Sequence, residues 1–312
     1  MHPAPSIIIF STLSGAGFGL IAFLSLFPLA ASPWPTVLSA ALAIGLCTAG
    51  LISSTFHLGR PERAWRALTQ WRSSWLSREG ILALATLTAF AGLVMLSLLR
   101  GGALPALGIL PAALAGSSVY ATGMIYASLR SVPTWHHPLT PWTYLAFSAA
   151  TSAMLCLALA LAFGSSGAGL LSGAALALLV IAWALKVAWW LSAARQRFGG
   201  STPESATGLG PLGRVRLFEA PHTSPNYLMK EMVFRIGRKH AAVLRRLAFT
   251  LGGVLPALLI VGSIAAAGAW LLVACALTCH FAGLLAERWL FFAEAEHTVG
   301  LYYGQGQAVG RA

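Results

Sequence analysis

The chain has 312 residues, of which 57% are hydrophobic and 9% are charged, and its mean hydropathy is +0.76. Soluble globular domains carry about 25% charged residues, so this composition excludes that class. Uncharged runs of about twenty residues are long enough to cross a hydrocarbon core of about 30 Å. The net charge of +12 indicates a membrane surface or a protein partner, and we do not expect nucleic acid as a partner.

The apolar runs predict an all-α membrane protein, a bundle of eight transmembrane helices that forms one integral membrane domain over residues 1–312. They show no period-two alternation, which argues against a β-barrel. The segment Met1–Ser6 has no Lys or Arg and the first run is long enough to span, so we do not expect a cleaved signal peptide. The expected spans are 7–30, 34–56, 79–99, 104–127, 142–163, 168–192, 247–268 and 269–292, with a tight turn through Ala267-Gly268 between the last two.

The basic residues are distributed unevenly between the two sides of the membrane. With eight spans, both termini and the loops after spans two, four and six share one side, and seventeen of the twenty Lys and Arg residues lie there. Only Arg100 lies on the other side, and Lys186 and Arg288 lie within spans. The positive-inside rule therefore predicts a multi-pass protein of the inner (cytoplasmic) membrane with both termini in the cytoplasm. Alternatively, these arginines face an acidic protein partner.

The longest connection, residues 193–246, is expected to be a cytoplasmic loop. Its first part, to about Pro225, is rich in Gly, Ser, Thr and Pro and predicts irregular structure. Its second part, 226–246, alternates apolar and basic residues at helical spacing and predicts a basic amphipathic helix. Such a helix lies on anionic membrane lipid or docks a soluble partner. The residues we expect to dock a partner are Arg66, Arg235, Arg238 and Lys239.

Several polar residues within the spans have alternative interpretations. The four cysteines form no CxxC pair and are interpreted as packing residues. His280 in the last span suggests a haem, but the other histidines lie near membrane surfaces, where they cannot supply a second axial ligand. We therefore expect no haem or metal in this chain. Lys186 is expected to snorkel toward the cytoplasm, and Glu287 and Arg288 to form an intramembrane pair.

A polar segment between spans two and three carries the best indication of function. His57 ends one span and Glu79 begins the next, so two titratable groups lie at the membrane surface. A quinone that is reduced there needs such a group at each ring oxygen. The structural alternatives are that His57 bonds a helix-end carbonyl and that Glu79 is favoured by the helix dipole just after a Ser77 cap. Aromatic residues between them, Trp65, Trp71 and Trp75, predict an interfacial hairpin.

Three motifs carry a resemblance to a known family. They are His57-Leu58-Gly59-x-Pro61 with Arg63, Ala64 and Ser77-x-Glu79; then Ser131-Val132-Pro133-Thr134-Trp135; then Glu287-Arg288 with His297-Thr298-Val299-Gly300. Together with the eight spans, the chain resembles the DmsC family, the membrane anchor subunits of dimethyl sulfoxide reductase-type molybdoenzymes. The resemblance extends over essentially the whole chain.

This resemblance implies a non-catalytic, quinone-interacting anchor subunit. Its expected cofactor is a quinone, ubiquinone or menaquinone, and its expected partners are a molybdopterin catalytic subunit and a four-cluster iron–sulfur subunit. The family's quinone-site histidine and glutamate correspond to His57 and Glu79. We assign Arg63 and Tyr126 to the same quinone-binding and proton-transfer site, and we assign no catalytic residue to this chain.

Two departures favour one branch of the family. The 193–246 loop is larger than expected for a dimethyl sulfoxide reductase anchor, and the basic side suggests a cytoplasmic partner. Both resemble the anchor of a cytoplasm-facing sulfite dehydrogenase, which passes electrons from sulfite to quinone. The alternative is an anchor of a reductase of dimethyl sulfoxide, or of another S- or N-oxide, that oxidises menaquinol. A secondary transporter using Lys186 and Glu287 is a remote alternative, because the chain has no inverted repeat.

Overall fold

The structure is a computed structural model and describes residues 3–28, 33–56, 58–165, 167–193, 197–219, 240–265 and 269–303. Within these ranges it contains helices and no strand, and eight helical segments are long and apolar enough to span a membrane. Seven are single helices: α1 (Pro5–Leu26), α2 (Pro33–Thr55), α3 (Trp75–Arg100), α4 (Pro105–Ala127), α5 (Leu139–Ala162), α6 (Ala168–Ala193) and α12 (Ala269–Ala293). The remaining span joins α10 (Ala241–Phe249), the π-helical turn η4 (Thr250–Val254) and α11 (Leu255–Ser263). The expected all-α, eight-helix membrane architecture is therefore confirmed.

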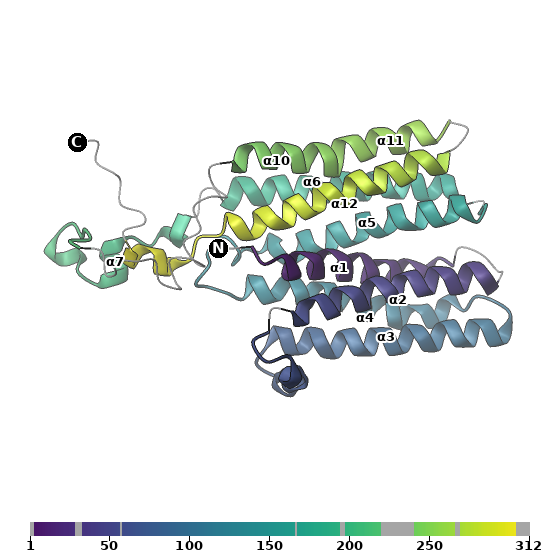
Figure 1. Ribbon diagram of the computed structural model, residues 1–312, viewed down its shortest axis with the longest axis horizontal. Coiled ribbons are helices and arrows are strands. Elements are labelled where there is room, and N and C mark those ends of the chain that lie inside the picture. Colours follow the sequence, from purple (N-terminus) through teal and green to yellow (C-terminus); the bar gives the residue numbers. More distant parts are fainter. Residues whose placement is uncertain are drawn as a thin grey trace.

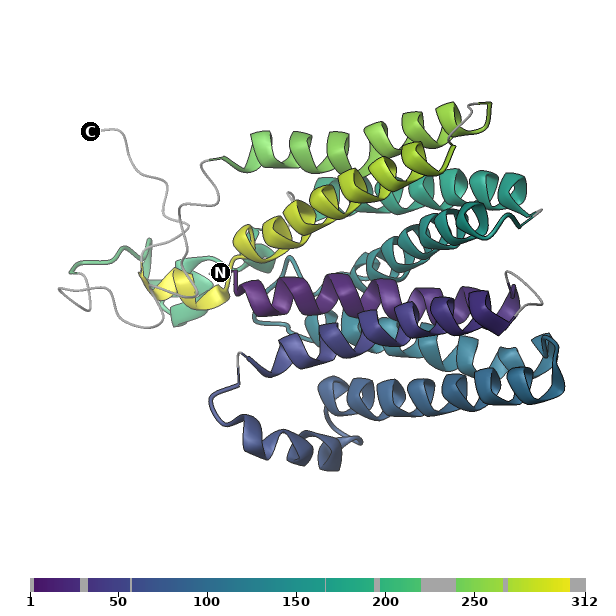
Figure 2. The ribbon, with the colours of Figure 1, turned by 45° about the vertical axis from the view of Figure 1, so that its right-hand side comes forward.

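The helices run side by side along one long axis, in two groups that meet at α1 and α5 (Figure 1, Figure 2). One group contains α1 to α4, and the other contains α5, α6, α10, α11 and α12. Helix α1 contacts α2, α4 and α5, so the N-terminal helix lies at the centre of the bundle. Hydroxyl groups of α5 reach it directly, since Ser148 and Ser152 donate hydrogen bonds to the carbonyls of Gly15 and Ala16 at 2.6 and 3.1 Å.

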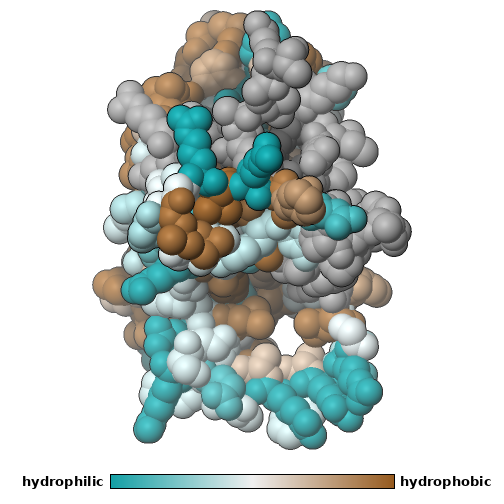
Figure 3. Space-filling model, turned by 90° about the vertical axis from the view of Figure 1, so that its left-hand side faces the viewer, coloured by the Kyte–Doolittle hydropathy of each residue, from teal (hydrophilic) through white to brown (hydrophobic). Residues whose placement is uncertain are grey.

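Short irregular elements gather at one end of the bundle, which we call the N-terminal face. The N-terminus lies there, with the 3₁₀ helix η1 (Pro61–Gln70), the short helix α7 (Pro203–Thr207) and the 3₁₀ helices η2 (Arg197–Gly200), η3 (Gly210–Leu212) and η5 (Thr298–Tyr303). Seen from this end, hydrophilic residues form the lower rim and surround apolar residues nearer the centre (Figure 3). At the opposite end, the described connection between α3 and α4 is a tight turn at Gly101-Gly102. The larger irregular elements of the described structure therefore lie at the N-terminal face.

Small residues allow the helices to approach closely. A Cβ atom at Gly108 of α4 would overlap the backbone of Ser25 in α1, and one at Gly283 of α12 would overlap the backbone of Gly252. In lipid, van der Waals packing and interhelical hydrogen bonds hold helices together, so such glycines mark the tightest contacts. The glycines of α1, which superficially resemble a nucleotide-binding pattern, serve this purpose too: Gly17 and Gly19 lie against α2 and α5.

The π-helical turn η4 explains the buried histidine of the last span. Pro256 has no N–H to offer to the carbonyl of Gly252, four residues earlier in the chain. That carbonyl accepts a hydrogen bond from Nδ1 of His280 at 2.7 Å, and Nε2 of His280 lies 2.9 Å from the hydroxyl of Thr151. Both ring nitrogens are thus engaged by protein groups, and His280 repairs a break in the neighbouring helix.

Some boundaries differ from the sequence-based ones. Helix α3 begins at Trp75, after Ser74, so Ser77 is not its cap and its hydroxyl is buried without a hydrogen-bond partner. Residues 241–246 begin α10 and are continuous with the seventh span, which the hydropathy pattern started at 247. Residues 226–239 of the predicted amphipathic helix lie outside the described residues, whereas residue 240 is described. The turn at Ala267-Gly268 also lies outside the described residues.

Candidate functional site

The segment between α2 and α3 folds back along the start of α3. Every residue of η1 is at least partly exposed, and Leu68 lies directly against Gly80, where a Cβ atom would meet its side chain at 2.8 Å. Arg78 holds the end of the segment by donating to the carbonyls of Trp71 and Arg72 at 2.9 and 2.7 Å. Three arginines of this region lie over tryptophan rings: Arg66 on Trp65, Arg72 on Trp71 and Arg78 on Trp75.

Glu79 is enclosed within the bundle. Its residue is 3% exposed, and its Oε1 accepts a hydrogen bond of 2.5 Å from the hydroxyl of Thr122 on α4. A carboxyl group at this depth has lost its hydration, so the Thr122 hydroxyl is its principal compensation. Deeper in the bundle, Thr86 of α3 and Ser118 of α4 join the same two helices through their hydroxyls at 3.1 Å. Polar contacts therefore line the α3–α4 seam inward from Glu79.

Tyr126 lies one turn beyond Thr122 on the same face of α4. It is buried in an aromatic cluster, stacked on Tyr144 with ring centroids 5.7 Å apart. Trp135, Phe291 and Phe292 meet its ring edge-on at 5.4 to 5.5 Å. Tyr126 thus connects the α3–α4 half of the bundle to α5 and α12. Sequence analysis included Tyr126 but missed Thr122, although their separation of four residues places both on one helix face.

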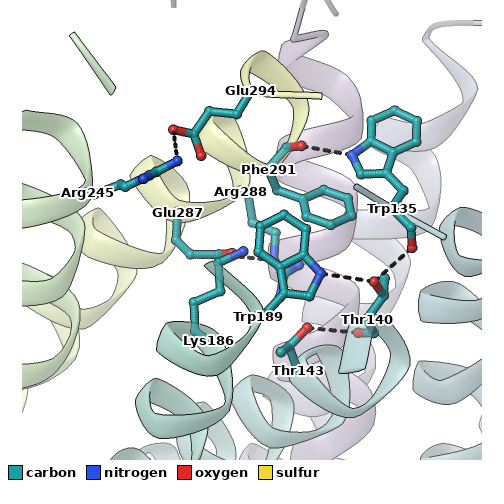
Figure 4. A network of polar contacts seen from close by, with 10 residues as sticks. All are labelled: Trp135, Thr140, Thr143, Lys186, Trp189, Arg245, Glu287, Arg288, Phe291 and Glu294. Carbon is teal, nitrogen blue, oxygen red and sulfur yellow. Dashed lines mark hydrogen bonds and ion pairs between the residues drawn. The ribbon is translucent and has the colours of Figure 1, made fainter. Parts of the chain in front are cut away.

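Three charged side chains lie buried together in the other half. The ammonium of Lys186 in α6 is 2.5 Å from Oε1 of Glu287 in α12, and Nε of Arg288 is 3.3 Å from Oε2 of the same carboxylate. The three side chains are at most 3% exposed, and Figure 4 shows them side by side. The expected Glu287–Arg288 pair is confirmed. Lys186 does not snorkel: it pairs with Glu287 and lies over the Trp189 ring at 3.9 Å.

The network continues to the N-terminal face. Glu294, just past the end of α12, is 2.8 Å from Arg245 of α10, and the Arg245 side chain is 40% exposed (Figure 4). Burial raises the pKa of Glu294 above its usual range, and the charge of Arg245 opposes that rise. Lys186 and Glu287 also act on Glu294 electrostatically. The Lys186 ammonium and the carboxylates of Glu287 and Glu294 therefore belong to one cluster of interacting charges.

The second and third motifs meet in space. The N–H of Thr298 donates to the carbonyl of Ser131 at 2.9 Å, and the indole N–H of Trp135 donates to the carbonyl of Phe291 at 2.8 Å (Figure 4). Trp135 and Thr140 continue this network to Trp189 on α6, through hydrogen bonds of 2.8 and 3.1 Å. These backbone and indole contacts tie the α4–α5 loop to the end of α12.

Beyond the spans, residues 197–219 and η5 form a projecting platform at the N-terminal face. The Tyr302 hydroxyl donates to the carbonyl of Ala206 at 2.7 Å, and Glu204 accepts from the N–H of Val215 at 3.0 Å. Two large apolar side chains of the platform stand free, Leu212 at 86% and Phe218 at 95% exposure. Apolar side chains so exposed indicate a contact surface when they cluster outside the membrane.

The described structure covers only part of the predicted site. His57, Arg235, Arg238 and Lys239 lie outside the described residues. Arg63 is exposed on η1, 3.9 Å from Glu62, and Arg66 is exposed beside it. Glu79 and Tyr126 lie inside the bundle. Thr122 lies between them, because it donates a hydrogen bond to Glu79 and is one turn from Tyr126 on α4. Among the described residues, no three His, Cys, Asp or Glu side chains come together as a metal site.

These features define a multi-pass α-helical membrane protein with a buried glutamate near one polar face, and comparison with known proteins identifies its family. Residues 1–196 match the family model described as DMSO reductase anchor subunit (DmsC). The chain belongs to this family and is a membrane anchor of a molybdoenzyme.

Two curated proteins illustrate the relationship. The chain is 35% identical to the C subunit of sulfite dehydrogenase from Allochromatium vinosum, over 97% of this chain and 99% of that protein. It is 33% identical to the C subunit of anaerobic dimethyl sulfoxide reductase from Haemophilus influenzae, over 32% of this chain and 37% of that protein. No solved structure matches the chain.

Proposed function

We propose that this anchor subunit passes electrons from an iron–sulfur subunit to a quinone at the N-terminal face, and that sulfite oxidation in a molybdopterin subunit supplies them. The single observation that carries the proposal is the near full-length similarity to the C subunit of a sulfite dehydrogenase. The similarity to a dimethyl sulfoxide reductase subunit extends over only a third of this chain. That reductase function, with menaquinol as the electron donor, is the second candidate.

The chemistry assigns proton transfer to this chain and electron supply to its partners. Sulfite and water yield sulfate, two electrons and two protons, and the quinone takes up two electrons and two protons to become quinol. In our proposal, Glu79 and His57 each deliver one of these protons to a ring oxygen. Arg63 and Tyr126 complete the proposed site, Arg63 from the exposed η1 and Tyr126 from within the bundle. Because Glu79 is 3% exposed, a quinone ring has to displace neighbouring side chains to reach it.

The soluble subunits are proposed to dock on the same face. The projecting platform with Leu212 and Phe218 supplies apolar contact area, and the exposed Arg66 adds charge. We keep Arg235, Arg238 and Lys239 as further docking candidates, on a basic segment that also suits anionic lipid. The excess of basic residues on this side supports a cytoplasmic orientation, with a four-cluster iron–sulfur subunit placed above the quinone.

Replacement of Glu79 by Gln tests the quinone site. The change preserves the size and the hydrogen bond to Thr122 but removes the exchangeable proton, so we expect quinone-linked sulfite oxidation to decrease about 100-fold. Sulfite oxidation with an artificial dye that accepts electrons from the soluble subunits should stay unchanged. Both rates are measured on the same membranes.

Glu62→Gln is the matched control, because Glu62 is an exposed carboxylate on η1. It should leave both rates at the wild-type level. Wild-type quinone turnover in Glu79→Gln would contradict the proposed site. Sulfite-independent turnover that is driven by dimethyl sulfoxide would support the reductase candidate instead.

A further inference from the structure

The polar groups of the two halves of the bundle lie in one layer. Glu79 is four residues from the start of α3, Thr122 five from the end of α4, and Tyr144 five from the start of α5. Glu287 and Lys186 lie six and seven residues from the ends of α12 and α6. At 1.5 Å per residue, these groups all lie about 6 to 10 Å below the N-terminal face. A polar layer thus crosses the bundle parallel to the membrane.

A small cavity borders this layer and extends deeper into the bundle, to Thr151 of α5 and Leu284 of α12. Its volume is about 10 Å³, room for roughly one water molecule, and its wall includes both Thr122 and Arg288. Thr122 is the residue that donates to Glu79, and Arg288 is the residue that pairs with Glu287. The cavity therefore lies between the Glu79 site and the buried charged cluster.

Two buried hydroxyl groups lie in the cavity wall, Oγ1 of Thr12 on α1 and the phenol oxygen of Tyr144 on α5, and their residues are 2% and 3% exposed. The Thr12 hydroxyl has no hydrogen-bond partner among the described residues, whereas the Tyr144 hydroxyl interacts with Arg288 and Tyr126. One water molecule in the cavity would satisfy the Thr12 hydroxyl and contact that of Tyr144. The guanidinium of Arg288, 3.8 Å from the Tyr144 ring centroid, adds a fixed positive charge that orients such a water.

The charges in the layer are complementary across the cavity. Lys186 and Arg288 carry two positive charges, and Glu287 carries one negative charge, so the cluster has a net charge of +1 when all are ionised. Glu79 lies on the other side of Thr122 and supplies the balancing negative charge when it is ionised. Buried charges in a membrane are costly unless they are paired, and these charges balance only when Glu79, on the far side of the cavity, is counted.

We propose that this layer is a proton path that reprotonates Glu79 from the α10–α12 side of the N-terminal face. The inference rests on the proposed quinone function. After Glu79 gives its proton to a reduced quinone oxygen, Thr122 passes a proton to the Glu79 carboxylate and takes one from the cavity water. Tyr144, which lines the cavity, refills that water and regains its proton from the neighbouring Lys186–Glu287 pair, and Glu294 takes up the replacing proton at the surface. Each transfer moves one proton and leaves every relay group as it began.

The surface end of the path is suited to proton uptake. Glu294 is partly covered, and burial holds its pKa above the usual carboxyl range. It faces Arg245 of α10 at 2.8 Å and, electrostatically, Lys186 of α6 and Glu287 of α12. Glu79 faces the Thr122 hydroxyl at 2.5 Å and, electrostatically, Tyr126 of α4 and Tyr144 of α5.

The test removes the two hydroxyls without changing the size of the side chains. The double variant Thr12→Val with Tyr144→Phe should dry the cavity, so quinone-linked turnover should decrease about tenfold at alkaline pH and recover partly at mildly acidic pH. The solvent deuterium isotope effect on that turnover should rise, because proton delivery becomes rate-limiting. The KM for quinone and the dye-linked rate should stay unchanged. Thr12→Ser, which keeps a hydroxyl, should show the wild-type pH profile when Tyr144 is left unchanged.

Thr143→Val is the matched control, because Thr143 is buried beside Tyr144 but donates to the Thr140 carbonyl at 2.8 Å and does not line the cavity. A wild-type pH profile and isotope effect in the double variant, with Glu79→Gln inactive, would overturn the path and leave the proposed function standing. Equal losses in Thr143→Val would also overturn it, because the effect would then be one of packing. An active Glu79→Gln would instead contradict the proposed function itself.

Discussion

At the scale of single residues, buried polar side chains in this bundle have different roles, although all of them lie in similar apolar stretches of the sequence. His280 and Glu79 both interrupt apolar helices, and either one could have been a ligand or a proton carrier by sequence alone. In the structure, both ring nitrogens of His280 are engaged by Gly252 and Thr151, whereas the Glu79 carboxylate accepts a hydrogen bond from the Thr122 hydroxyl. The contacts of His280 therefore identify it as a packing residue of the last two spans.

The role of His280 can be tested by His280→Ala. The substitution leaves the Gly252 carbonyl without the donor that replaces the missing N–H of Pro256, so we expect a loss of about 1–3 kcal/mol in the free energy of unfolding. Thermal unfolding of the detergent-solubilised complex should occur several degrees lower. The exposed His240→Ala should unfold like the wild type. Loss of a haem absorption band in His280→Ala would instead favour the haem interpretation.

At the scale of helices, close backbone contacts decide which spans can lie together. Span seven carries a π-helical turn at Thr250–Val254, and its Gly252 lies directly against Gly283 of α12. The side chain of Trp183 on α6 packs against two glycines of the π-helical turn, Gly252 and Gly253. This contact lies one helical turn deeper than Glu287 on α12, and the Arg245–Glu294 ion pair joins the same two helices nearer the N-terminal face.

Gly283→Ala should therefore separate α12 from the π-helical turn. An added methyl group has no room against the Gly252 backbone, and we expect a destabilisation of about 1–3 kcal/mol. Gly116→Ala is the matched control, since a Cβ atom there meets nothing within 4 Å and alanine favours the helix. Proteolytic sensitivity of the assembled complex measures both variants. Equal resistance of the two would mean that the α10–α12 contact is looser than this packing implies.

At the scale of the whole molecule, the eight spans of the described structure place the residue before α1 and the residues after α12 at the same end of the bundle. The polar N-terminal face, the candidate quinone site and the platform then all share that side. The distribution of basic residues predicts that this side is cytoplasmic. A catalytic partner on that side would meet sulfite produced inside the cell and would need no export signal.

Reporter fusions test this orientation. A reporter after Ala312 should be active in the cytoplasm, and one inserted between Gly101 and Gly102 should be active outside, because that turn lies at the opposite end. The gene of the neighbouring molybdopterin subunit should encode no twin-arginine signal. External activity of the C-terminal fusion, together with such a signal, would indicate an exported reductase and contradict the sulfite proposal.

The sequence alone determined the fold class, the eight spans and the end of the bundle that carries the polar residues. Length and hydropathy are sufficient for this, because a lipid core demands about twenty apolar residues per helix and excludes charge. The family motifs added His57 and Glu79, and the tendency of adjacent opposite charges to pair gave Glu287 with Arg288.

Only the tertiary structure decided how the helices are rotated against one another. Lipid is as apolar as the interior of the bundle, so hydropathy does not tell a buried helix face from a lipid-exposed one. The partners of Lys186 and Glu79, the buried hydroxyls of Thr12 and Tyr144, and the cavity between them come from different helices. These residues come together because the helices pack closely at Gly17, Gly108 and Gly283. No local sequence pattern predicts which helix each of these glycines contacts.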